Sequence, residues 1–278
     1  MTDRTAGEGR ASAGSSRELL VRLASAVALA IVALAGAVVG GWAAAAVVAA
    51  VVIVVHLEWS AMSEGALMPG GVMTAALVAA LAVFTLGYPG IALAIAAVAV
   101  VAAAVTGGQV WRPFGVFYAA VLGFGLLAIR LSGAMGLDGV LFLLAVVWAT
   151  DTGAFFVGRG LGGPKLWPQV SPKKTWSGAL GGLVAGVAAG AIVLSVAGLP
   201  VTVIALIIAG ALAVVSVLGD LFESAVKRRF GTKDSGWLIP GHGGLLDRVD
   251  GLIAAAGLAA LIGWAHAGVS VGQGLLVW

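Results

Sequence analysis

The chain has no cysteine and carries very little charge for its length. The missing cysteine excludes a disulfide framework, a thiolate nucleophile and cysteine-ligated zinc. Only 10% of the 278 residues are charged, whereas a soluble domain has about 25%. Apolar residues make up 61%, and the mean hydropathy is +1.12. No single soluble core could bury this much apolar surface, so we expect the solvent around most of the chain to be lipid.

The apolar residues are gathered in runs of a length that crosses a bilayer as a helix, about 17–25 residues. These runs predict an all-α, polytopic membrane protein with about nine transmembrane helices. Residues 1–17 are Gly, Ser, Ala and charge, which predicts a flexible cytoplasmic tail. We expect N-terminal transmembrane helices over 18–135 and a C-terminal transmembrane region that holds the functional residues over 136–278. The runs are 19–39, 41–57, 70–87, 90–107, 114–132, 139–158, 175–198, 201–222 and 250–270.

The basic residues fix the expected orientation. Cytoplasmic segments are enriched in Lys and Arg. With nine spans and a cytoplasmic N-terminus, Arg130 alone falls outside, so 14 of the 15 basic residues (15 minus 1) lie inside. This topology predicts a multi-pass protein of the cell (inner or plasma) membrane, with both long polar loops on the cytoplasmic face.

Acidic residues stand at the ends of two predicted spans. Asp220 and Glu223 close the eighth run, and a spacing of three places them on one helical face. A carboxylate within a span costs about 2.5–3.5 kcal/mol or more, although Asp220 at the interface could simply meet water. Asp247 and Asp250 open the ninth run, where the helix dipole alone would favour acids. If the two helix ends converge, they could hold a divalent cation.

Basic residues supply the counterpart to these acids. Lys227, Arg228 and Lys233 are expected on the loop between the two acidic pairs. A second basic segment, residues 171–176 (SPKKTW), precedes the seventh run, where Ser or Thr could cap a helix whose N-terminus favours phosphate. Asp151 interrupts the sixth run at the same free-energy cost. The pattern of cations and carboxylates predicts the handling of phosphate and metal.

The polar residues of the segment 224–250 (SAVKRRFGTKDSGWLIPGHGGLLDRVD) occur at characteristic spacings. The segment resembles the signature motif of the phosphatidate cytidylyltransferases, the CDP-diacylglycerol synthases, without departure over its whole length. The segments GDLFES (219–224), DTGAFFVGR (151–159) and SPKKTW (171–176) are also similar to that family. The N-terminal half matches only as a set of hydrophobic spans.

The resemblance implies an enzyme that converts CTP and phosphatidic acid to CDP-diacylglycerol and diphosphate for phospholipid biosynthesis. It implies a Mg²⁺ requirement, with room for a potassium ion at the same centre, and a homodimer; no nucleic-acid partner is expected. Asp220, Asp247 and Asp250 would hold the metal. The expected catalytic residues are these three with Lys227 and His242. The expected substrate-binding residues are Asp151, Ser171, Lys174, Thr175, Ser224, Arg228, Lys233, Asp234 and Arg248.

In the mechanism we expect, the lipid phosphate attacks the α-phosphorus of CTP in line. Both reactants are anions, so the cations would relieve repulsion without a covalent intermediate. Two other functions remain open from the residues alone. Intramembrane carboxylates also occur in transporters, and a CTP-dependent polyprenol or lipid kinase would use similar groups. The clustering of the acids at one cytoplasmic end favours the enzyme.

Overall fold

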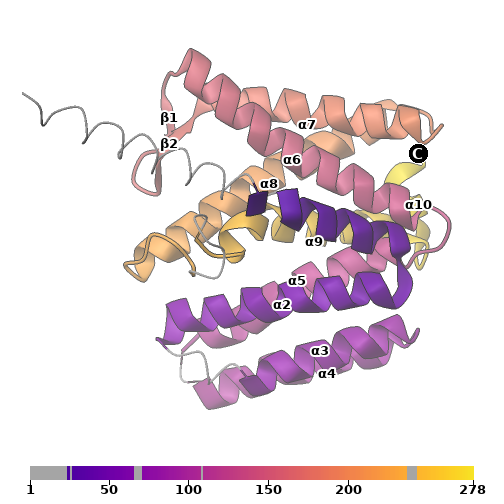
Figure 1. Cartoon of the computed structure of the whole chain (residues 1–278), viewed down its shortest axis with the longest axis vertical. Helices are drawn as coiled ribbons and strands as arrows, with labels where there is room; N and C mark the ends of the chain where they lie inside the picture. The colour runs from indigo at the N-terminus through magenta and orange to yellow at the C-terminus, as the bar shows by residue number, and fades with distance from the viewer. Residues whose placement is uncertain (1–23, 26, 66–70, 108, 237–242) are drawn as a thin grey trace, which may run out of the picture.

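The computed structural model describes residues 24–25, 27–65, 71–107, 109–236 and 243–278. Its long helices run roughly side by side, and one short hairpin lies at the left of the view in Figure 1. A first helix spans Val27–Val39. The helices that follow are α2 (Gly41–Glu64), α3 (Gly71–Thr85), α4 (Pro89–Gly107), α5 (Trp111–Arg130), α6 (Gly136–Leu161), α7 (Trp176–Val196), α8 (Val203–Arg229), α9 (Leu246–Ala267) and α10 (Val271–Leu276).

The helix lengths confirm the expected fold class. In the described ranges, seven helices are long and apolar enough to cross a membrane, and two shorter apolar helices, Val27–Val39 and Gly71–Thr85, correspond to the first and third predicted runs. The count of about nine spans is therefore approximate. The short helix α10 was not anticipated from the sequence.

A row of glycines brings α6 and α7 together. Gly178, Gly182, Gly186 and Gly190 recur every four residues and are all buried. A Cβ on Gly182 would lie 2.6 Å from the carbonyl oxygen of Thr150 on α6. Small residues let helix backbones approach in a bilayer, where dispersion forces act over short distances. This contact fixes α6 and α7, which flank the second basic segment.

Helix α9 lies within the bundle and packs against α5, α8, α6 and α10. Three ion pairs join separate helices and strands on one side of the molecule, and we call this side the polar end. They link Glu64 with Arg112, Lys174 with Asp220, and Lys227 with Asp247. At the opposite end, Arg130 donates to the carbonyl oxygens of Ala37 and Val38.

Two features differ from the sequence-based expectation. Lys227 and Arg228, expected on a loop, lie in the last turns of α8, because this helix continues seven residues beyond the apolar run to Arg229. The polar segment before α7 forms an antiparallel hairpin of β1 (Lys165–Trp167) and β2 (Ser171–Thr175). The predicted tail 1–17 lies outside the described residues. The predicted division between 135 and 136 stays a prediction.

Candidate active site

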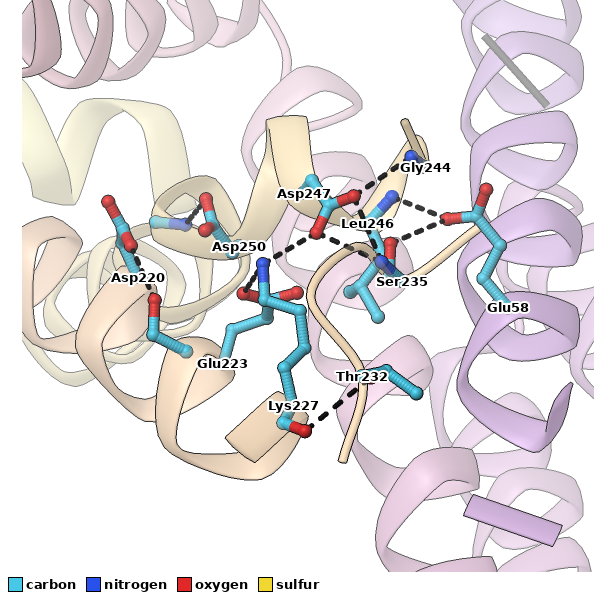
Figure 2. Close-up of polar contacts among 12 residues, drawn as sticks. Glu58, Asp220, Glu223, Lys227, Thr232, Ser235, Gly244, Leu246, Asp247 and Asp250 are labelled. Carbon is cyan, nitrogen blue, oxygen red and sulfur yellow. Dashed lines mark hydrogen bonds and ion pairs between the residues drawn. The ribbon is translucent and has the colours of Figure 1, made fainter. Parts of the chain in front are cut away.

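Lys227 stands between two carboxylates at the polar end (Figure 2). Its Nζ lies 2.7 Å from Glu223 Oε2 on the preceding turn of α8 and 2.6 Å from Asp247 Oδ1 on α9. The side chain of Glu223 is fully buried, and neither of its oxygens makes a hydrogen bond of good geometry, so the lysine meets it as a charge. Lys227 thus joins the end of α8 to the start of α9.

Asp247 is held by backbone amides as well as by the lysine. Ser235 N donates to Oδ1 at 3.2 Å and to Oδ2 at 3.0 Å, and Gly244 N donates to Oδ2 at 2.8 Å. Gly243, with φ of +85°, provides the left-handed backbone that turns this amide toward the helix start. Both carboxylate oxygens of Asp247 are therefore engaged by the protein itself.

A second group of acids begins at Asp220, one turn before Glu223 on α8. Asp220 Oδ2 lies 2.6 Å from Lys174 Nζ, and Ser224 Oγ donates to Asp220 Oδ1 at 3.3 Å. Asp250 Oδ1 accepts from Gly251 N at 2.7 Å. The negative charges of Asp220, Glu223 and Asp151 act on Asp250. Four acids from α6, α8 and α9 are thus close enough for mutual repulsion, with Lys174 at their edge.

Thr175 caps helix α7. Its Oγ1 accepts from Gly178 N at 3.1 Å and lies 3.0 Å from Ser177 Oγ. This confirms a Ser or Thr cap at the helix start, and it places Lys174 one residue before the positive end of the helix dipole. Ser171, at the other end of β2, pairs with Trp167 in the hairpin.

The remaining predicted site residues that the structure describes lie at the surface. The structure leaves exposed side chains at Arg228, Lys233, Asp234 and Arg248. A Cβ on Gly243 would lie 3.4 Å from Cβ of Asp234, so Asp234 adjoins the loop that holds Asp247. His242 lies outside the described residues.

The structure separates the three predicted metal ligands by their contacts. Asp220 faces Lys174, Asp247 faces Lys227, and Asp250 lies among carboxylates. Among the described residues there is no group of three or more His, Cys, Asp or Glu side chains that could hold a metal ion. The metal role of these three aspartates stays a prediction.

Sequence reasoning missed Glu58. This residue lies in the last turns of α2, is 7% exposed, and accepts hydrogen bonds from the N-terminus of α9. The second apolar run was predicted to end at residue 57, whereas α2 continues to Glu64 and includes Glu58. A carboxylate in an apolar run is costly, and this signal, which marks Asp151, marks Glu58 as well.

The fold and the site define a class: a multi-pass α-helical membrane protein with a cluster of carboxylates and lysines at one end of its bundle. The model of the cytidylyltransferase family matches residues 20–265. This match covers most of the chain, and the chain belongs to the cytidylyltransferase family.

Several relatives carry the name phosphatidate cytidylyltransferase. One from Brucella suis biovar 1 (strain 1330) is 53% identical over 160 residues, which covers 56% of this chain and 58% of that protein. One from Bacillus subtilis (strain 168) is 48% identical over 119 residues, covering 42% and 44%. One from Staphylococcus saprophyticus is 43% identical over 132 residues, covering 47% and 51%. The aligned part thus spans about half of each relative's length.

Proposed function

We propose that this protein is a phosphatidate cytidylyltransferase, which joins CTP and phosphatidic acid to give CDP-diacylglycerol and diphosphate. Membership of the family and the names of the relatives support this activity. The observation that carries it is the meeting of Lys174 and Lys227 with carboxylates of α8 and α9 at one end of an apolar bundle. A site for two phosphate-bearing substrates needs such cations beside acids that can hold a metal.

The surroundings of Lys174 suit the lipid substrate. An apolar groove between β1, α7 and α8 is lined by side chains that include Trp176, Leu218 and Leu221. Leu221 follows Asp220 directly, and Trp176 follows the cap residue Thr175. A lipid whose acyl chain lies in this groove would bring its phosphate to Lys174 and to the N-terminus of α7, which favours anions. CTP would then approach from water, over the exposed Arg228, Lys233 and Arg248.

The reaction needs no strong base, because the lipid phosphate is already ionised at neutral pH. Its oxygen forms a bond to the α-phosphorus of CTP, the bond from that phosphorus to the bridging oxygen breaks, and the electron pair leaves with diphosphate. Lys227, fixed by two carboxylates, donates to a triphosphate oxygen and offsets charge there. Lys174 holds the attacking phosphate in line. Ser224 and Asp234 would line the polar surroundings of the substrate phosphates. We propose that His242 orients the diphosphate.

Mg²⁺ fits Asp220 and Asp250 better than a three-aspartate cage. Mg²⁺ is usually held by one or two carboxylates, with substrate phosphates and water filling the remaining positions. Asp250 interacts with the carboxylates of Asp220, Glu223 and Asp151, whose repulsion a cation would offset. Asp220 is held by the side chains of Lys174 and Ser224, whereas Asp247 is held by two backbone amides as well as by Lys227. Bound there, the ion would neutralise phosphate oxygens as a Lewis acid. Asp247 would act by positioning Lys227. A potassium ion at the same centre stays a prediction from the resemblance.

The orientation and assembly also belong to this proposal. The polar end would face the cytoplasm, where CTP is available, and the membrane would be the cell membrane. A homodimer is expected, which light scattering of the detergent-solubilised protein measures directly.

The position of a radioactive label tests the activity. The purified protein is incubated with phosphatidic acid, Mg²⁺ and CTP labelled at either the α- or the γ-phosphate. We expect label in the lipid from α-labelled CTP only. Lipid labelled from γ-labelled CTP, with a polyprenol as acceptor, would identify a kinase instead. Label in no lipid would overturn the proposal and return transport to consideration.

A further inference from the structure

Glu58 is a buried carboxylate of the N-terminal half that contacts the candidate active site (Figure 2). Its Oε1 accepts from Leu245 N at 3.0 Å, and its Oε2 accepts from Leu246 N at 2.7 Å and from Ser235 Oγ at 3.3 Å. A buried carboxylate is costly unless its oxygens are hydrogen-bonded. The three donors satisfy both oxygens.

These contacts give α9 a cap from another helix. The first N–H groups of a helix have no partner within it. The residue at the N-cap position, Leu245, has no side chain that could accept from them. Glu58 supplies the acceptors from α2, 187 positions earlier in the chain than Leu245. A negative charge there also interacts favourably with the helix dipole.

Two glycines lie too close to Glu58 to carry a side chain without a shift. A Cβ on Gly236 would lie 2.5 Å from Glu58 Oε1, and a Cβ on Gly244 would lie 2.7 Å from Glu58 Oε2. Such approaches are closer than van der Waals contact allows. The two glycines therefore let the backbone approach the carboxylate closely at these two positions.

The same loop holds Asp247. Ser235 donates through its hydroxyl to Glu58 and through its amide to Asp247. Gly244 N also donates to Asp247, and the two amides that follow it, Leu245 N and Leu246 N, donate to Glu58. Asp247 in turn lies 2.6 Å from Lys227 Nζ. One continuous series of contacts thus runs from α2 to the lysine between α8 and α9.

We propose that Glu58 is a positioning residue for the nucleotidyl-transfer site. It fixes the start of α9 and the backbone at Ser235, and these two elements place Asp247 so that it holds Lys227 against the substrate phosphates. This inference rests on the proposed function for its catalytic consequence. It also gives the N-terminal helices a role at the site. An amide side chain has a single acceptor, so Glu58→Gln would turn an NH₂ group toward one of the two backbone N–H groups at nearly unchanged volume.

The test compares Glu58→Gln and Glu58→Asp with Glu64→Gln in the full-length protein in detergent. Glu64 lies on the same helix and pairs with Arg112 at the start of α5, so its variant removes one charge from α2 without removing the hydrogen bonds that Glu58 accepts. Two quantities are measured: kcat per folded protein with CTP and phosphatidic acid, and hydrogen exchange at the amides of Ser235, Gly244, Leu245 and Leu246. Lost stability alone would lower the folded fraction but leave its kcat unchanged.

We expect Glu58→Gln to lower kcat about tenfold or more, since small displacements of catalytic groups can cost up to about 100-fold, and to speed exchange at all four amides. Glu58→Asp should fall between Glu58→Gln and the wild type, and Glu64→Gln should match the wild type. Equal kcat for Glu58→Gln and Glu64→Gln would overturn the proposal. So would unchanged exchange at Ser235 and Gly244, a readout that remains even if the wild type transfers no nucleotide and the proposed function fails.

Discussion

Replacing Lys227 by methionine should destabilise the protein by a predictable amount. The lysine side chain is 14% exposed, and it faces the side chains of Glu223 and Asp247, which are 0% and 8% exposed. Removing one partner of a buried ion pair costs about 3–5 kcal/mol, because the remaining charge stays uncompensated. Methionine keeps the length of the side chain but leaves two carboxylates facing each other. At about 2–4 °C per kcal/mol for domains of 150–250 residues, we expect the unfolding midpoint to fall by about 6–20 °C.

A second substitution separates charge from packing. Asp247 keeps the amide donors Ser235 N and Gly244 N without the lysine, whereas Glu223 loses its ion-pair partner. Adding Glu223→Gln to Lys227→Met should therefore recover at least half of the lost midpoint but none of the activity. Arg228→Met, at the exposed next position, should change stability by less than about 0.5 kcal/mol. Thermal unfolding in one detergent at one scan rate measures all of these variants. A wild-type midpoint for Lys227→Met, or a further fall when Glu223→Gln is added, would refute the reasoning.

Three further outcomes follow from the packing and the site. Gly182→Leu should lower stability by about 1–3 kcal/mol, because the added side chain meets the α6 backbone at Thr150. Gly160→Ala is the control, since a Cβ there meets nothing within 4 Å. Equal unfolding midpoints for the two variants would contradict the close contact. Thr175→Val should cost about 1 kcal/mol through loss of the α7 cap, and Thr175→Ser should restore it; unfolding midpoints that do not differ would argue against the cap. Chelation of divalent cations should stop CDP-diacylglycerol formation, and excess Mg²⁺ should restore it; full activity in chelator would exclude the metal.

The apolar runs allowed the helices to be predicted, because a bilayer requires long unbroken helices. The end of α8 was missed: hydropathy stops at the first charges, whereas Lys227 remains helical by pairing with Glu223 one turn earlier and with Asp247 on α9. The hairpin before α7 was missed because its strands are only three and five residues long, and the longer one, SPKKT, is polar.

The composition of the site was predictable from the sequence, but its pairings were not. Asp247 and Asp250 share one face of α9, yet Asp247 faces Lys227 and Asp250 faces the acids of α8. Which partner each carboxylate meets depends on how α8 and α9 pack, and this is not encoded in local spacing. The contact of Glu58 with Leu246, 188 positions apart, has no local signature at all.

The most direct measurement of the central claim compares two aspartates that lie at opposite ends of the bundle. Asp250 lies among the carboxylates of the polar end, whereas Asp138 lies in the first turn of α6, at the other end. With α-labelled CTP, phosphatidic acid and Mg²⁺, we predict that Asp138→Asn forms labelled CDP-diacylglycerol at the wild-type rate and that Asp250→Asn forms it at least about 100-fold more slowly. Wild-type rates for Asp250→Asn would contradict the account.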